Sequence, residues 1–145
     1  MTDAWIVGAV RSPVGRRGGA LSTVHPADLG AHVLRALVER TGVDPGEIDD
    51  VLWGCVGQVG AQASNIGRTT VLSAGWPEHV PAMTIDRQCG SSQQALHAAA
   101  HQIRAGDADL VVAGGVEVMS QVPIASPTRL GLEAGMAHPR GGADW

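Results

Sequence analysis

Residues 82–105, AMTIDRQCGSSQQALHAAAHQIRA, form the stretch that decides the fold. The short apolar run at 82–86 is typical of a buried strand, and the alanine-rich stretch at 89–105 is typical of a helix. A second apolar run, Leu110 to Ala113, follows and ends at a pair of glycines. A strand, a helix and a strand in this order predict a parallel, right-handed βαβ unit.

The same alternation extends toward the amino terminus. Apolar residues recur at helical spacing between Pro26 and Arg40, with Gly42 just past the end, where glycine commonly stops a helix. Further elements are expected as strands over 5–10 and 50–55 and as a helix between 64 and 75. Strands separated by helices predict an α/β fold with a mostly parallel sheet covered by helices. After Val116 this pattern decays.

Composition excludes several classes of protein. The 145 residues include 10 Lys plus Arg and 14 Asp plus Glu, a formal charge of −4, whereas a nucleic-acid binder needs a basic face. Hydrophobic residues make up 44% and charged residues 17%, which favours one folded domain over disorder. No apolar stretch approaches the roughly 18 residues of a membrane span. We therefore expect a cytoplasmic protein without nucleic-acid or membrane partners.

Cys89 is the candidate nucleophile. It lies where the predicted strand turns into the predicted helix, and the free N–H groups and dipole of a helix start favour a thiolate. Gly90 lets an acyl group approach the backbone, whose N–H groups could hold a thioester oxygen. The alternative is a buried structural cysteine, which is how we interpret Cys55 within its strand.

Other reactive patterns are weaker. Ser91 and Ser92 lack the Gly-x-Ser-x-Gly context of a serine nucleophile, and we expect them to satisfy backbone donors at the helix start. His97 and His101 are spaced to share one helix face, as zinc ligands do, but no third ligand stands nearby. We therefore predict no metal site, and a zinc-binding module remains a distant alternative.

Four segments together resemble the thiolase family. Residues 86–95, DRQCGSSQQA, are similar to the nucleophile motif of thiolases, and residues 114–120, GGVEVMS, are similar to a segment that follows their fourth strand. The segments 7–15 and 54–68 are similar as well, so the resemblance covers about residues 5–130 in order. The chain resembles the amino-terminal half of a thiolase.

The resemblance implies a fold and a reaction. Thiolases contain two βαβαβαββ halves with a loop domain inserted in the first, so residues 1–119 are expected to form the amino-terminal domain, without its last strand, and 120–145 to begin the loop domain. Cys89 would take an acyl group from a 3-oxoacyl-CoA, with its backbone N–H in an oxyanion hole. Coenzyme A would be a substrate, no covalently bound cofactor is implied, and Met119 would lie near the site wall.

The chain also departs from the family pattern. The second half of a thiolase supplies the base histidine and a second cysteine, and neither position exists here. His138, in the string Ala137-His138-Pro139, is similar to the family's Gly-His-Pro base motif but comes too early, so we interpret it as a coincidence. The 145 residues alone are therefore not expected to complete turnover, and their uncovered apolar surface is expected to associate. The partners implied are the missing carboxy-terminal half and a second copy in a homodimer or homotetramer.

Two alternatives from other classes stay open. One is a non-catalytic acyl-CoA-binding or assembly subunit of thiolase fold, and the other is a ketoacyl-synthase-type condensing enzyme. The sequence of residues 86–94 resembles that of degradative thiolases more than that of biosynthetic ones. This resemblance favours a role in the breakdown of fatty acids or steroid side chains.

Overall fold

Three of the predicted strands pair into one parallel sheet in the computed structural model, which describes residues 3–137. The central strand β1 (Asp50–Gly54) lies between β2 (Ala82–Ile85) and β3 (Val111–Gly115). Because the pairing is parallel, all three strands end at the same edge of the sheet. The loops that follow Gly54, Ile85 and Gly115 therefore leave from one edge.

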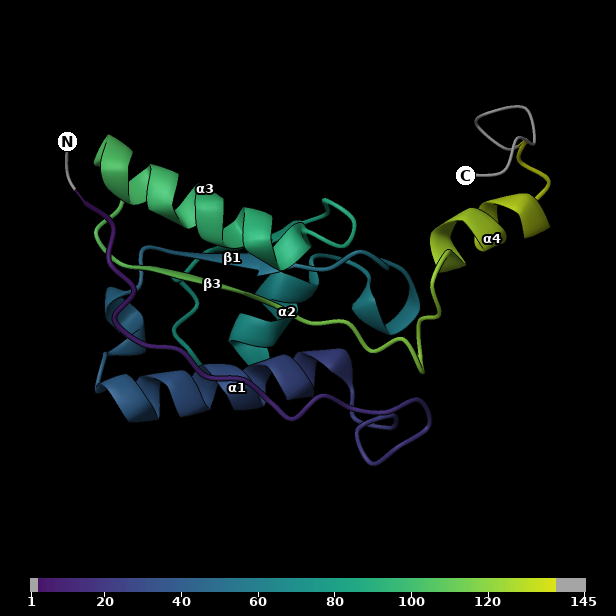
Figure 1. The fold of residues 1–145 in the computed structure, drawn as a ribbon, viewed down its shortest axis with the longest axis horizontal. Coiled ribbons are helices and arrows are strands. Elements are labelled where there is room, and N and C mark those ends of the chain that lie inside the picture. The colour runs from purple at the N-terminus through teal and green to yellow at the C-terminus, as the bar shows by residue number, and fades with distance from the viewer. Residues whose placement is uncertain (1–2, 138–145) are drawn as a thin grey trace.

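Helices cover both faces of this sheet, which confirms the predicted α/β class. α3 (Ser91–Ala105) lies on one face, and α1 (Pro26–Thr41) and α2 (Ile66–Ser73) lie on the other (Figure 1). Two short 3₁₀ turns, η1 (Pro45–Glu47) and η2 (Gly60–Gln62), complete the connections around β1.

Local sequence accounts for both ends of α1. The His25 ring nitrogen accepts a hydrogen bond from the Ala27 N–H at 3.2 Å, and Pro26 supplies a preset φ in the first turn. At the other end Gly42 adopts φ 70°, and its N–H donates to the carbonyl of Val38 at 2.8 Å. The predicted helix over 26–40 is confirmed to within one residue at its carboxyl end.

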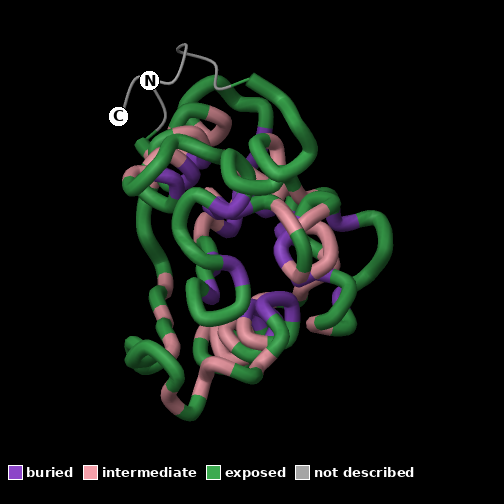
Figure 2. Tube along the Cα trace, turned by 90° about the vertical axis from the view of Figure 1, so that its right-hand side faces the viewer, coloured by how far each residue is buried: buried purple, intermediate pink, exposed green. Residues whose placement is uncertain are grey.

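The core has two layers because side chains alternate along β1. Val51, Trp53 and Cys55 pack with residues of α1 and α2, whereas Leu52 packs with Ala95 and Ala99 of α3. Figure 2 shows the buried segments gathered in the middle of the molecule. The small alanines let α3 lie close to the sheet.

Trp53 is the largest fully buried side chain, and glycines surround it. A Cβ atom added to Gly30 in α1, Gly67 in α2 or Gly114 in β3 would lie 3.0, 2.7 or 2.5 Å from an atom of this tryptophan. Each distance is shorter than an ordinary van der Waals contact. The side chain of Trp53 therefore fills space that the absence of three side chains provides.

The strand predicted at 5–10 is wrong. This segment runs extended along α1, where the Arg40 side chain donates to the Ala9 carbonyl at 3.0 Å, and it pairs with none of the described strands. Trp5, Ile6 and Val7 are 78%, 74% and 74% exposed. An apolar run becomes a strand only when a neighbouring strand supplies hydrogen-bond partners, and no neighbour lies beside this one in the described residues.

A fourth helix, α4 (Ser126–Glu133), was not expected from the sequence. It stands outside the two helical layers (Figure 1), and its Leu130 and Leu132 are about half exposed, at 47% and 49%. Pro127 and Gly131 within it are residue types that are typical of loops, so the sequence did not predict a helix here. Within residues 3–137, no helix is long and apolar enough to cross a membrane.

Candidate active site

Cys89 lies in an exposed turn between β2 and α3. The helix was predicted to begin at Cys89, but its first helical residue is Ser91 and its N-cap is Gly90, so Cys89 stands just outside it. The helix begins two residues later than predicted because the backbone of Gly90, at φ −99° and ψ 14°, is not yet helical. Cys89 thus lies just before the N-terminus of α3 and is exposed to solvent.

Hydrogen bonds from two side chains hold this turn. The Asp86 carboxylate accepts from the Gln88 N–H at 2.8 Å. The Ser91 hydroxyl accepts from the Arg87 N–H at 2.9 Å and donates to the Gln88 carbonyl at 2.6 Å. As expected, Ser91 satisfies backbone groups, and it is itself only 5% exposed. The turn around Cys89 is therefore tied both to the strand end and to the helix start.

Two glycines form the floor beneath this helix start. A Cβ atom on Gly54 would lie 2.4 Å from the backbone nitrogen of Ser92, and one on Gly115 would lie 2.2 Å from the Ser92 Oγ. These glycines end β1 and β3, so the first turn of α3 rests directly on two strand ends. Any larger residue at Gly54 would collide with the backbone of Ser91 and Ser92, which cannot move aside as a flexible side chain could.

Cys55 does not share the accessibility of Cys89. It is 1% exposed, and burial, followed by the nearby carboxylate of Glu117, raises the pKa of its thiol to about 12. A thiol that stays protonated is a poor nucleophile. The interpretation of Cys55 as a small core residue is confirmed.

A polar clamp formed by Glu117 and Gln62 joins the loops that follow β3 and β1. The Glu117 carboxylate accepts from the N–H groups of Val56 at 2.8 Å and Gly57 at 3.2 Å, and from the Gln62 amide at 2.6 Å. The fully buried Gln62 also donates to the Gly57 carbonyl and accepts from the Val118 N–H. Sequence reasoning quoted Glu117 only as part of a motif and missed Gln62, because nothing in the sequence marks a glutamine as buried.

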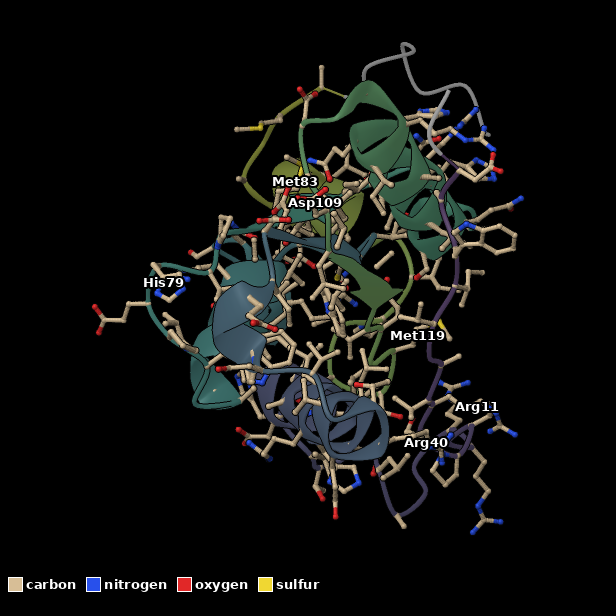
Figure 3. The ribbon with its side chains drawn as sticks, turned by 90° about the vertical axis from the view of Figure 1, so that its left-hand side faces the viewer. Arg11, Arg40, His79, Met83, Asp109 and Met119 are labelled. Atoms are coloured by element: carbon tan, nitrogen blue, oxygen red, sulfur yellow. The ribbon has the colours of Figure 1, made fainter. Side chains whose placement is uncertain are left out.

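Met119 lies on the same sheet edge as Cys89 but in a different environment. It is 54% exposed and lines a cavity of about 950 Å³ together with Arg11, Leu29 and Ile124. Figure 3 shows Met119 and Arg11 on the side of the molecule where the amino-terminal segment runs. Cys89 does not line this cavity, so the described residues do not bring the two predicted site residues into one pocket.

The histidines within residues 3–137 do not form a metal site. His97 and His101 are exposed on α3, and no group of three or more His, Cys, Asp or Glu side chains placed to hold a metal occurs within residues 3–137. His138, interpreted above as a coincidence, lies outside the described residues.

Comparison with known proteins identifies the family. The model of the thiolase amino-terminal domain matches residues 4–141, which is nearly the whole chain. The parallel sheet, the helices on both faces and the cysteine at the β2–α3 turn fit this match, and the chain belongs to the thiolase family.

Individual relatives support the same family. The steroid 3-ketoacyl-CoA thiolase FadA6 of Mycobacterium tuberculosis is 53% identical over 139 residues, which are 96% of this chain and 34% of that protein. A beta-ketoadipyl-CoA thiolase of Acinetobacter baylyi is 48% identical over 124 residues, 85% of this chain and 31% of that protein. The crystal structure of the Bacillus anthracis acetyl-CoA acetyltransferase matches with a TM-score of 0.77 and 48% identity, over 81% of this chain and 30% of that one. The chain spans about a third of the length of these relatives.

Proposed function

We propose that the chain belongs to an acyl-CoA thiolase in which Cys89 is the acyl-accepting nucleophile. The observation that carries this proposal is the exposed thiol of Cys89 at the strand-to-helix turn of a thiolase-family domain. The second thiol, Cys55, is buried and held protonated. This difference in exposure supports Cys89, rather than Cys55, as the proposed nucleophile.

In the proposed reaction, the Cys89 thiolate attacks the C3 carbonyl carbon of a 3-oxoacyl-CoA. The C2–C3 bond breaks, and its electron pair leaves on the C2 of acetyl-CoA, which takes up a proton. The acyl group remains on Cys89 as a thioester until the thiolate of coenzyme A attacks it and releases a shortened acyl-CoA. The covalent intermediate divides one difficult cleavage into two easier steps. The backbone N–H of Cys89 is proposed to stabilise the oxyanion.

The base and the second cysteine are proposed to come from the carboxy-terminal half that the family possesses. This chain covers only about a third of the length of its relatives, which supports a carboxy-terminal source for these two residues. Residues 3–137 by themselves are then not competent for turnover. We further propose that residues 1–119 form the amino-terminal domain and that 120–145 begin an inserted loop domain. The position of α4 outside the layers supports that boundary.

For the substrate, we propose a degradative 3-oxoacyl-CoA derived from fatty acids or steroid side chains. The name of the Mycobacterium tuberculosis relative, a steroid 3-ketoacyl-CoA thiolase, supports this class. We also propose a homodimer or homotetramer. In support, β2 is an edge strand of the described sheet, and its Met83 is 48% exposed.

Thiolysis of acetoacetyl-CoA by the full-length protein tests the proposal. We expect Cys89→Ala to lower kcat by about a thousandfold or more, because a covalent nucleophile is lost, and Cys55→Ala to retain turnover. Iodoacetamide should inactivate the enzyme in step with alkylation of Cys89, as followed by mass spectrometry. If Cys89→Ala keeps its thiolysis rate, the assignment of the nucleophile is wrong. An alkylated Cys89 in a protein without thiolysis would favour the acyl-CoA-binding alternative.

A further inference from the structure

We propose that Ser91 is a positioning residue that aims Cys89, an inference that rests on the proposed role of Cys89 as nucleophile. Ser91 begins α3 two residues after the cysteine. Its hydroxyl does not touch the thiol in any contact that the structure records. Instead it bonds to the backbone on both sides of Gln88, the residue that immediately precedes Cys89.

The conformation of Gln88 explains why such a bond is needed. At φ 51° Gln88 occupies the left-handed region, which residues with a Cβ enter only when their surroundings hold them there. The Ser91 hydroxyl holds the Arg87 N–H on one side and the Gln88 carbonyl on the other, at 2.9 and 2.6 Å. If the hydroxyl is lost, the Asp86 carboxylate and the Ser91 N–H still bond to Gln88, but the Arg87 N–H loses its partner. The turn is then held less firmly, and the N–H and thiol of Cys89 shift with it.

Because the start of α3 is packed tightly on the sheet, a relaxation of Gln88 shifts Cys89 rather than the helix. The backbone of Ser92 rests on Gly54 so closely that a Cβ there would lie 2.4 Å away, and the Gly115 backbone supports the Ser92 side chain. The helix start therefore cannot follow the turn as a rigid unit. A change in the turn is absorbed by residues 87–89, which include the nucleophile.

A second serine in the chain supplies a matched control. Ser126 begins α4, follows the left-handed Ala125, is also 5% exposed and donates to the Pro123 carbonyl at 2.6 Å. Its backbone N–H bonds to the same carbonyl at 3.1 Å, as the Ser91 N–H does to that of Gln88. Ser126 thus repeats the two bonds that Ser91 makes to one carbonyl, lacks the bond that the Ser91 hydroxyl accepts from the Arg87 N–H, and has no cysteine beside it.

The experiment compares Ser91→Ala, Ser91→Thr and Ser126→Ala in the full-length protein. We measure the rate of Cys89 alkylation by iodoacetamide, the kcat and KM of acetoacetyl-CoA thiolysis, and the Tm. Ser91→Ala should slow alkylation and lower kcat by about tenfold or more, with KM changed by less than about twofold, because misorientation at a reacting atom affects the chemical step. Ser91→Thr keeps a hydroxyl and should restore both rates to within about threefold.

Ser126→Ala should also lower Tm, though by less than Ser91→Ala because one hydrogen bond fewer is lost, while alkylation of Cys89 keeps its rate to within about twofold. The proposal is overturned if Ser91→Ala alkylates at the wild-type rate, or if Ser126→Ala slows alkylation equally. It is also overturned if threonine does not rescue. A Cys89→Ala variant with full thiolysis would refute the proposed nucleophile instead, so the two failures are distinguishable.

Discussion

The Gln62 amide donates a 2.6 Å hydrogen bond to the Glu117 carboxylate, across 55 residues of sequence and between the loops that follow β1 and β3. Gln62 is fully buried, and the amide uses both its oxygen and its nitrogen, toward Val118 and Gly57. Because a buried polar group without a partner is costly, the two loops are locked to each other through this one pair of side chains.

The first prediction concerns that pair. Gln62→Ala leaves the Gly57 carbonyl and the Val118 N–H without their partner and should lower the free energy of unfolding by about 2–4 kcal/mol. Glu117→Ala should cost less, about 1–2 kcal/mol, because Glu117 is partly exposed. Urea denaturation of both single variants and of the double variant measures the coupling, expected at about 1 kcal/mol or more. Strict additivity would show that the clamp does not act as a unit.

The second prediction concerns the glycine floor. Gly54→Ala places a Cβ 2.4 Å from the Ser92 nitrogen and should cost about 1–3 kcal/mol, since backbone on both sides must shift. The same shift should slow alkylation of Cys89. Gly131→Ala in α4 is the control, because its Cβ would meet only the Met136 sulfur at 3.7 Å. Thermal unfolding should show the control at or above wild-type stability; equal destabilisation of the two variants would contradict the prediction.

The third prediction separates the two thiols. Burial raises the pKa of the Cys55 thiol to about 12, so this thiol stays protonated at pH 8, and burial also blocks access to it. Iodoacetamide at pH 8 should therefore label Cys89 alone in the folded protein and both cysteines in urea. Peptide mass spectrometry distinguishes the sites, and rapid labelling of Cys55 without denaturant would contradict the structure.

The fourth prediction is a dependence on pH. Hydrogen bonds from the N–H groups of Leu110 and Asp109 lower the pKa of Asp49 below its usual 3.8. A lowered folded-state pKa stabilises the protein above the unfolded-state value, and this contribution is lost as the pH falls through the folded-state value. Urea midpoints between pH 6 and 2 should therefore fall less steeply for Asp49→Asn than for wild type. Glu39→Gln, on the exposed surface of α1, is the control for the change in charge.

The fifth prediction concerns the exposed amino-terminal segment. Trp5, Ile6 and Val7 present apolar side chains to solvent, so the 145-residue chain should associate at micromolar concentration. Sedimentation velocity should show less association for Trp5→Ser with Ile6→Thr than for wild type. Leu132→Ser, which removes an exposed leucine from α4, should have a smaller effect. A sedimentation coefficient that stays at the monomer value as the wild-type concentration rises would contradict the prediction.

Pattern alone predicted most of the fold, for reasons that particular residues make clear. The runs at 50–54, 82–85 and 111–115 pair with one another, so apolar sequence and strand coincide there. The run at 5–10 is equally apolar but has no neighbouring strand in the described residues, and sequence cannot report whether a partner is present. The α4 helix was missed because it is only eight residues long and contains Pro127 and Gly131, residue types that are typical of loops.

The site was predictable only in part. Cys89 could be singled out because a cysteine between a strand and a helix is a chemical signal as well as a structural one. Its position outside the helix depends on the non-helical backbone of Gly90, and the turn before it depends on the left-handed Gln88, for which the residue type gives no warning. Gln62 acts through a contact with Glu117, which is 55 residues away in the sequence, and Ser91 acts through the backbone of a turn. Both contacts exist only after folding.

The three glycines around Trp53 restrict how this core can change over evolutionary time. A methyl group at Gly30 or Gly114 collides with the indole, one at Gly67 collides with the Cβ of Trp53, and a smaller residue at position 53 leaves a void costing about 3–5 kcal/mol. Neither kind of substitution is tolerated on its own, so positions 30, 53 and 114 can change only through simultaneous, compensating replacements. Gly67 cannot be compensated in this way, because every residue but glycine has a Cβ at position 53. A library that randomises positions 30, 53 and 114 together should yield survivors in which a shrunken aromatic is matched by at least one enlarged glycine.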